Sequence, residues 1–228
     1  MADRIWDSVL VPSSEQWGLK GTARTGGQSF SGAEQLVESP TARVTASLTI
    51  PCNTREKVLA ARRVIALGRS QVWVLGPIEV RRAPWAVDPL TGGKITYARQ
   101  DGGAATPYDR ASDFVLASAA LLNTTTITVT RRAGGHVLPG QFLSIGNRLH
   151  TIVDLLSGDP TEAGSGLAIP GNITLSIRPW TRADYAAGAA VEFGRPVCRM
   201  RLASDDTGDL ALQLSRMGSA TFDFVEAT

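Results

Sequence analysis

The chain has 228 residues and a formal net charge of +2, with 43% hydrophobic and only 19% charged residues. This length allows one or two domains, each able to bury a core, and so small a net charge argues against nucleic-acid binding as the main role. A charged fraction below the usual quarter or so suggests that part of the surface is covered in an assembly.

The first residues, MADRIW, lack the apolar core of a signal peptide, and no stretch is long and apolar enough to span a membrane. We therefore expect a protein that is made in a cytoplasm and has no membrane segment. Cys52 and Cys198 match no metal or redox spacing, so we expect free, largely buried thiols.

Residues 1–21 contain short apolar runs and two tryptophans. They fit either an extended arm that packs on another element or a first strand of the core sheet. Residues 22–28 are rich in glycine and threonine and predict a loop. Residues 29–37 predict a strand that pairs with residues 43–50 as a hairpin, since residues 43–50 alternate between apolar and polar and Pro51 should end that strand.

A helix is predicted over residues 53–67. Asn53 is the expected N-cap, and Glu56, three residues later, can close a capping box. An apolar stripe runs along this segment, and Gly68 stands where a left-handed C-cap is needed. The stripe consists of Val58, Ala61, Val64 and Ile65. Residues 71–75 then predict a buried strand, and no other strong helix follows.

Residues 88–112 are rich in turn-forming residues and predict an irregular excursion. Short strands follow, and those over 114–116, 124–130, 141–145, 148–153 and 172–177 describe a small barrel or sandwich. Further strands are expected over 189–193, 198–202 and 219–225.

The order of these elements predicts a mainly β protein with a discontinuous first domain. Residues 1–110 contain the helix and several strands but no closing strand, and the strands in 197–228 have no small domain of their own. We expect the barrel, 111–196, to be inserted into the first domain, with the tail returning to complete the first sheet. Two domains in series, with the tail in the barrel, is the alternative.

Candidate chemistry is sparse. His136 and His150 have no spaced partner of the kind that a zinc site or a nucleophile–base pair requires. Asp154 and Asp159 could form a carboxylate pair, but a Gly-Asp-Pro turn explains Asp159 without chemistry. The acidic residues of 205–209 depart from the calcium-loop pattern. We therefore expect a protein that is not an enzyme and binds no cofactor or metal.

Arginine doublets are the most distinctive polar feature. Arginine suits bidentate contact with carboxylates across a protein interface, or phosphate contact along a channel, although a solvated surface is the default explanation of each doublet. The candidate interface residues are Arg62, Arg63, Arg81, Arg82, Arg131 and Arg132.

Several stretches, spread over most of the chain, resemble the distal tail proteins, or baseplate hub proteins, of long-tailed bacteriophages. In the first half these are SFSGAEQLV (29–37), RVTASLTIP (43–51) and the helix whose end, LGRS, leads to VWVL (72–75). In the second half they are LPGQFLSIG (138–146), LHTIV (149–153), ITLSIRPW (173–180), RLAS (201–204) and FDFVEA (222–227).

This resemblance implies an amino-terminal β-sandwich hub domain that carries one helix and forms a ring, most simply a hexamer, at the end of the tail tube, with a second β-domain projecting outward. It implies a structural virion protein at the tail tip, assembled in the host cytoplasm. Its partners would be copies of itself, the tail tube protein, the tail hub or tape-measure protein and receptor-binding proteins, with DNA only in transit and no membrane. The excursion over 88–112 departs from the family pattern, and the family supplies no catalytic residues.

Two other functions fit the same residues. A tail-tube or tail-completion protein would share the ring but lack a projecting second barrel. A carbohydrate-binding β-module would need exposed aromatic side chains beside a groove, for which Trp85, Trp180 and Tyr185 are the candidates.

Overall fold

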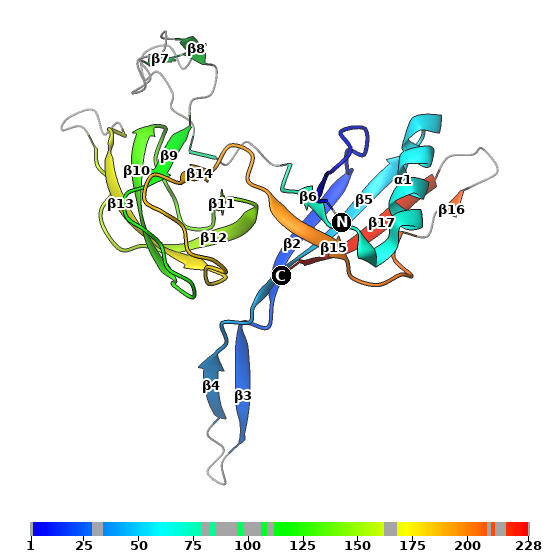
Figure 1. The fold of residues 1–228 in the computed structure, drawn as a ribbon, viewed down its shortest axis with the longest axis horizontal. Coiled ribbons are helices and arrows are strands. Elements are labelled where there is room, and N and C mark those ends of the chain that lie inside the picture. Colours follow the sequence, from blue (N-terminus) through cyan, green and yellow to red (C-terminus); the bar gives the residue numbers. More distant parts are fainter. Residues whose placement is uncertain are drawn as a thin grey trace. The chain divides into compact units, whose positions relative to one another are not determined.

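The fold is taken from a computed structural model that describes residues 2–28, 34–78, 83–84, 95–97, 106–108, 112–161, 168–208, 211–212 and 218–227. The chain divides into two compact units, Met1–Ile78 with Cys198–Thr228 and Glu79–Val197. We call them the sheet unit and the barrel unit, and each is mainly β (Figure 1). No helix in the described ranges is long and apolar enough to cross a bilayer.

The sheet unit is built on one mixed sheet with the strand order β1-β6-β15-β17-β5-β2, and β16 pairs with β17 beside it. β1 runs parallel to β6, and the other pairs are antiparallel. The strands are β1 (Arg4–Ile5), β2 (Ser14–Lys20), β5 (Arg43–Cys52), β6 (Trp73–Leu75), β15 (Cys198–Leu202), β16 (Ala211–Leu212) and β17 (Gly218–Glu226). β3 (Ala23–Gln28) and β4 (Glu34–Glu38) form a separate two-stranded hairpin.

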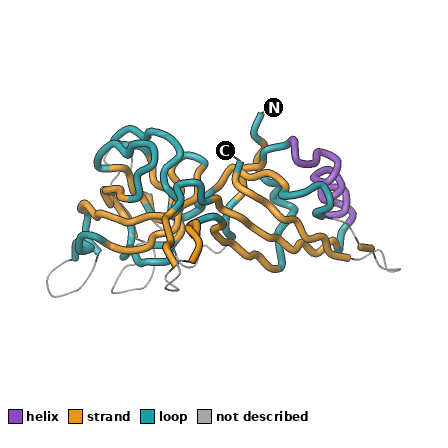
Figure 2. The backbone as a smooth tube through the Cα atoms, turned by 90° about the horizontal axis from the view of Figure 1, so that it is seen from below, coloured by secondary structure: helices purple, strands orange, loops and turns teal. Residues whose placement is uncertain are grey.

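One face of the mixed sheet is buried. β5 alternates strictly between buried and half-buried residues, as its sequence predicted, and Val44, Leu48 and Ile50 point into the core. The N-terminal segment and α1 (Arg55–Leu67) cover this face, and Figure 2 shows the helix on one side of the strands. Trp6 packs edge-to-face on Trp73, with ring centroids 5.6 Å apart, and also contacts the phenylalanines of β17.

The predicted helix forms, with one correction at its start. The N-cap is Thr54 rather than Asn53, because Thr54 has the extended backbone and its hydroxyl accepts a hydrogen bond from the Lys57 amide. Gly68 ends the helix as predicted, at φ 57°, and its amide donates to the carbonyls of Val64 and Ile65. A 3₁₀ turn, η1 (Gly68–Ser70), follows.

Three local predictions in the sheet unit were wrong. Residues 23–28 form strand β3 rather than a loop, and β4 pairs with β3 rather than with β5. β5 instead lies between β2 and β17, because the long C-terminal strand matches its register over eight residue pairs. Pro51 does not end β5, since Pro51 and Cys52 still face Ser219 and Gly218 at the end of the ladder. Residues 29–33 lie outside the described part of the chain.

The barrel unit contains a closed barrel with the strand order β10-β13-β12-β11-β14-β9, in which every neighbouring pair is antiparallel. Closure leaves no strand edge unpaired. The strands are β9 (Asp113–Leu116), β10 (Thr126–Ala133), β11 (Phe142–Ile145), β12 (Arg148–Leu155), β13 (Gly171–Arg178) and β14 (Ala190–Glu192). β11 and β12, predicted as strands over 141–145 and 148–153, pair as a hairpin through Gly146 and Asn147.

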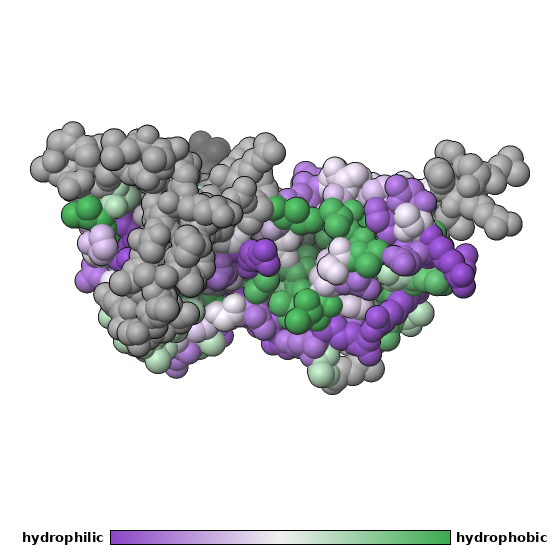
Figure 3. Space-filling model, turned by 90° about the horizontal axis from the view of Figure 1, so that it is seen from above, coloured by the Kyte–Doolittle hydropathy of each residue, from purple (hydrophilic) through white to green (hydrophobic). Residues whose placement is uncertain are grey.

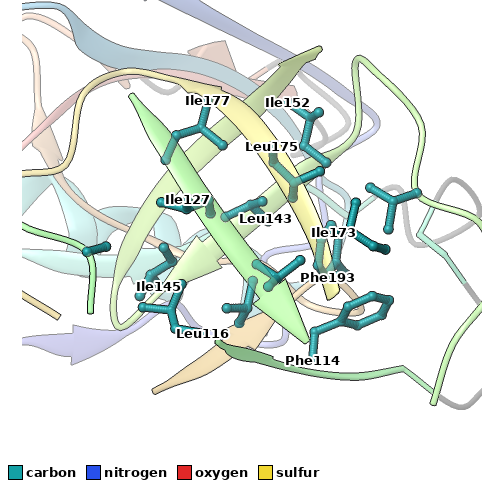
Figure 4. Close-up of a cluster of buried hydrophobic side chains, with 14 residues drawn as sticks. Phe114, Leu116, Ile127, Leu143, Ile145, Ile152, Ile173, Leu175, Ile177 and Phe193 are labelled. Atoms are coloured by element: carbon teal, nitrogen blue, oxygen red, sulfur yellow. The ribbon is translucent and has the colours of Figure 1, made fainter. Parts of the chain in front are cut away.

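Aliphatic side chains from alternate positions fill the barrel, as Figure 4 shows. Ile127 and Val129 point inward from β10, while Ile173, Leu175 and Ile177 point inward from β13. Phe114 and Phe193 close one region of the core with ring centroids 4.6 Å apart. The interior is a packed core rather than a channel.

Beyond the barrel strands, the barrel unit contains a small hairpin of β7 (Ile95–Tyr97) and β8 (Thr106–Tyr108). The rest of the predicted excursion over 88–112, apart from Ser112, lies outside the described residues. Cys52 and Cys198 are free and buried, as predicted, and burial raises the pKa of the Cys52 thiol.

Candidate functional site

The arginines identified from the sequence differ in how exposed they are in the structure. Arg62 and Arg63 are exposed on α1, and Arg132 is exposed on β10. Arg131, the other half of that doublet, is only 1% exposed. Arg81 and Arg82 fall in a part of the chain that the structure does not describe. The structure thus brings Arg62 and Arg63 to one helix surface and takes Arg131 into the end of the barrel.

Arg131 joins three segments at the end of the barrel. Its Nε donates to the Ile169 carbonyl at 2.9 Å, and its Nη1 donates to the Gly135 carbonyl at 3.1 Å. Nη1 also pairs with the Asp159 carboxylate, and Nη2 donates to the Pro160 carbonyl at 2.6 Å. Because a buried guanidinium needs acceptors for all its donors, this network fixes the loops around it.

Asp159 extends the same network to His136. Its second oxygen lies 2.8 Å from His136 Nδ1 and accepts a hydrogen bond from the Val137 amide at 3.3 Å. Asp154, the other carboxylate considered from the sequence, accepts from the Leu155 amide at 2.8 Å. These two carboxylates serve separate backbone turns, and the His136–Asp159 pair belongs to the loop network.

A pocket of about 460 Å³ opens between the N-terminal segment and α1. We call it the N-terminal pocket. Ile5, Ala60 and Val64 give it apolar walls, and Trp73 lies at its buried side. Four charged residues complete the lining, namely Asp3, Arg4, Asp7 and Arg63. Figure 3 shows hydrophobic patches among hydrophilic ones on this unit, and Ile5 is its most exposed large hydrophobic residue, at 84%.

The charges around the N-terminal pocket are unevenly paired. Asp3 is held by Arg199, with Nε and Oδ2 2.6 Å apart, and Asp7 accepts a hydrogen bond from the Val9 amide. Arg4 and Arg63 have no carboxylate partner in the described ranges. The lining itself holds two arginines and two aspartates, and Arg199, which lies outside the lining, already pairs with Asp3. The pocket thus combines apolar walls with two arginines that could pair with a carboxylate from outside.

A second depression, of about 750 Å³, lies on the other face of the mixed sheet. Gly18, Thr45, Ser47 and Asp223 line it together with longer residues such as Gln16 and Lys20, so its lining is mixed. No described element of the sheet unit covers this face. The sheet unit therefore offers two separate surfaces, one with apolar walls and two arginines and one with a mixed lining.

The remaining sequence candidates do not converge on these surfaces. Trp180 and Tyr185 are half-buried on the barrel unit, and Tyr185 packs against the barrel core. Trp85 and Asp209 belong to the undescribed ranges. Within the ranges that are described, no three His, Cys, Asp or Glu side chains come close enough to hold a metal ion.

Sequence reasoning identified Arg63 but missed Arg4, Ile5 and Trp73 as its neighbours. The missing information is the parallel pairing of the short β1 with β6, which brings the N-terminus beside Trp73. The one available signal was an exposed hydrophobic residue between charges, Asp3-Arg4-Ile5, before a tryptophan.

A scan against protein-family models finds no match for this chain, and a search of curated proteins finds none significantly similar to it. The site is therefore interpreted from its own residues.

Proposed function

We propose that this protein is a structural component of the tail tip of a long-tailed bacteriophage, of the distal tail protein class. The observation that carries the proposal is the resemblance of stretches in both halves of the chain to that family. The architecture supports it, because a sheet with one helix is interrupted in sequence by a closed β-barrel.

In this proposal the sheet unit is the ring-forming hub domain and the barrel unit is peripheral. The hub of the resembled family is a β-sandwich, whereas the described part of the sheet unit has one large sheet with a helix on its buried face. The opposite face carries a depression of about 750 Å³ with a mixed lining. A neighbouring copy packing there would supply the second layer of the sandwich.

A closed ring requires a heterologous interface, in which one surface of each copy meets a different surface of the next. The sheet unit has two dissimilar surfaces of this kind. Copies of the chain would thus form a ring, sixfold in this proposal, between the tail tube protein and the hub, tape-measure and receptor-binding proteins. A net charge of +2 is compatible with DNA passing through without being held.

Mass photometry and negative-stain electron microscopy of the purified protein test this proposal. We expect a ring with a central hole and a mass near six subunits, and antibody labelling of intact phage should place the protein at the tail tip. A monomer at micromolar concentration, an assembly with no passage through it, or absence from the tail tip would contradict the proposal.

A further inference from the structure

A β-bulge on β12 presents an apolar and an acidic side chain together on the outside of the barrel. Ile152 faces Ile177 and Asp154 faces Ser176, so Val153 is an extra residue without a partner on β13. Successive strand residues normally point to opposite faces of a sheet, but at the bulge two successive side chains, Val153 and Asp154, are both exposed. Val153 is 52% exposed and Asp154 is also exposed, while Leu155 turns back to pack against the core.

This pair has the chemistry that the N-terminal pocket lacks. The pocket has apolar walls at Ile5 and Val64 and two arginines, Arg4 and Arg63, that have no carboxylate partner among the described residues. Among the described residues, only Oδ1 of Asp154 has a hydrogen-bond donor, the Leu155 amide, so the other carboxylate oxygen can accept from a partner. An aliphatic side chain next to a carboxylate would fill the apolar part of the pocket and pair with its two arginines.

We infer that the N-terminal pocket of one copy binds the bulge of a second copy, with Val153 against Ile5 and the Asp154 carboxylate on Arg63 and Arg4. This inference rests on the proposed ring, and it adds to the seam between sheet units a contact of the barrel unit with the next copy. The contact is heterologous, because the pocket belongs to the sheet unit and the bulge to the barrel unit. A heterologous contact of this kind repeats from copy to copy around a ring.

Charge exchange tests the inference on the full-length protein. Arg63→Glu and Asp154→Arg should each raise the concentration at which the assembly dissociates by about tenfold or more, a factor typical of losing one close charge pair at an interface. The double variant, Arg63→Glu with Asp154→Arg, should restore most of that loss. Arg62→Glu is the matched control, because Arg62 is exposed on the same helix but does not line the pocket.

A cysteine pair identifies the partner independently. Ile5→Cys with Val153→Cys should give a ladder of cross-linked subunits on a non-reducing gel, whereas Ile5→Cys with Val37→Cys should not, although Val37 is 55% exposed beside the acidic Glu38. The native thiols are buried and should not interfere.

The outcomes separate this inference from the proposed function. A ring that forms normally in all the charge variants, or that the double variant does not restore, overturns the inference and leaves the proposed function intact. A cysteine pair that cross-links only within one chain would also overturn it. A wild-type protein that stays monomeric contradicts both.

Discussion

His150 is a histidine enclosed in the barrel, where it is 1% exposed. It faces Leu143 of β11 on the inward side of β12, and its Nδ1 donates to the Pro179 carbonyl at 2.8 Å. Burial lowers the pKa of its imidazole to about 4, against the opposing effect of that hydrogen bond, and the charges of Arg148 and Arg182 lower it further. The ring is therefore neutral in the folded protein near pH 7.

This low pKa makes the barrel unit sensitive to acid. Between pH 6.5 and 4 the unfolded chain binds a proton at His150 that the folded chain does not, so stability is full above pH 6.5 and falls as the pH decreases toward 4. From pH 7 to pH 5 we expect a loss of about 2 kcal/mol from this residue. Urea denaturation of wild type and His150→Gln at both pH values measures this loss of stability. An equal pH dependence of stability in the two proteins would contradict the prediction.

The inward orientation of Arg131 could have been predicted from the sequence. Ile127 and Val129 alternate inward along β10, and the same alternation places Arg131 inward and Arg132 outward. Arg131 and Arg132 look like one surface feature when they are read as a doublet, but strand periodicity places them on opposite sides of β10. The partners of Arg131 could not be predicted, because Asp159 and the Pro160 and Ile169 carbonyls reach it from a distant loop.

At the scale of elements, α1 is held to the sheet by a narrow contact. Ala61 is fully buried and Val64 is 1% exposed, while the other predicted stripe residues, Val58 and Ile65, are only half-buried. Leu59, on the outer side of the helix, is 51% exposed. The helix therefore depends on very few side chains for its packing.

Ala61→Asp places a carboxylate in this apolar contact, away from the N-terminal pocket, and should destabilise the sheet unit by about 3 kcal/mol or more, because the charge is desolvated without a partner. Leu59→Asp is the matched control and should change stability by less than about 0.5 kcal/mol. Thermal unfolding of both variants measures the difference. Equal melting temperatures would show that the buried face of α1 is assigned incorrectly.

The strands could be predicted more reliably than their partners. The alternation in residues 43–50 located β5, but its neighbours β2 and β17 come from opposite ends of the chain, and only the sheet as a whole determines that choice. The bulge at Val153 was also invisible in the sequence, since it arises from the register between β12 and β13.

At the scale of the whole molecule, the barrel unit has its own core and a closed set of strands. We expect a protein of residues 79–197 to fold alone, because barrel closure pairs both edges of every barrel strand within this segment. Its amide proton spectrum should be well dispersed, and its melting temperature should stay within a few degrees of the barrel transition in the full chain. A spectrum typical of random coil would show that the barrel needs the sheet unit.

The pairing of β15 with β6 has a consequence for the order in which the protein matures on the ribosome. Cys198 lies opposite Leu75, and β17 separates β15 from β5 in the middle of the sheet. The strands that join the two halves of the sheet are thus translated after the whole barrel unit. The barrel can therefore fold before β15 and β17 are synthesised, while the N-terminal strands and α1 still expose their apolar faces. We expect this N-terminal segment to be the part of the nascent chain that most needs a chaperone.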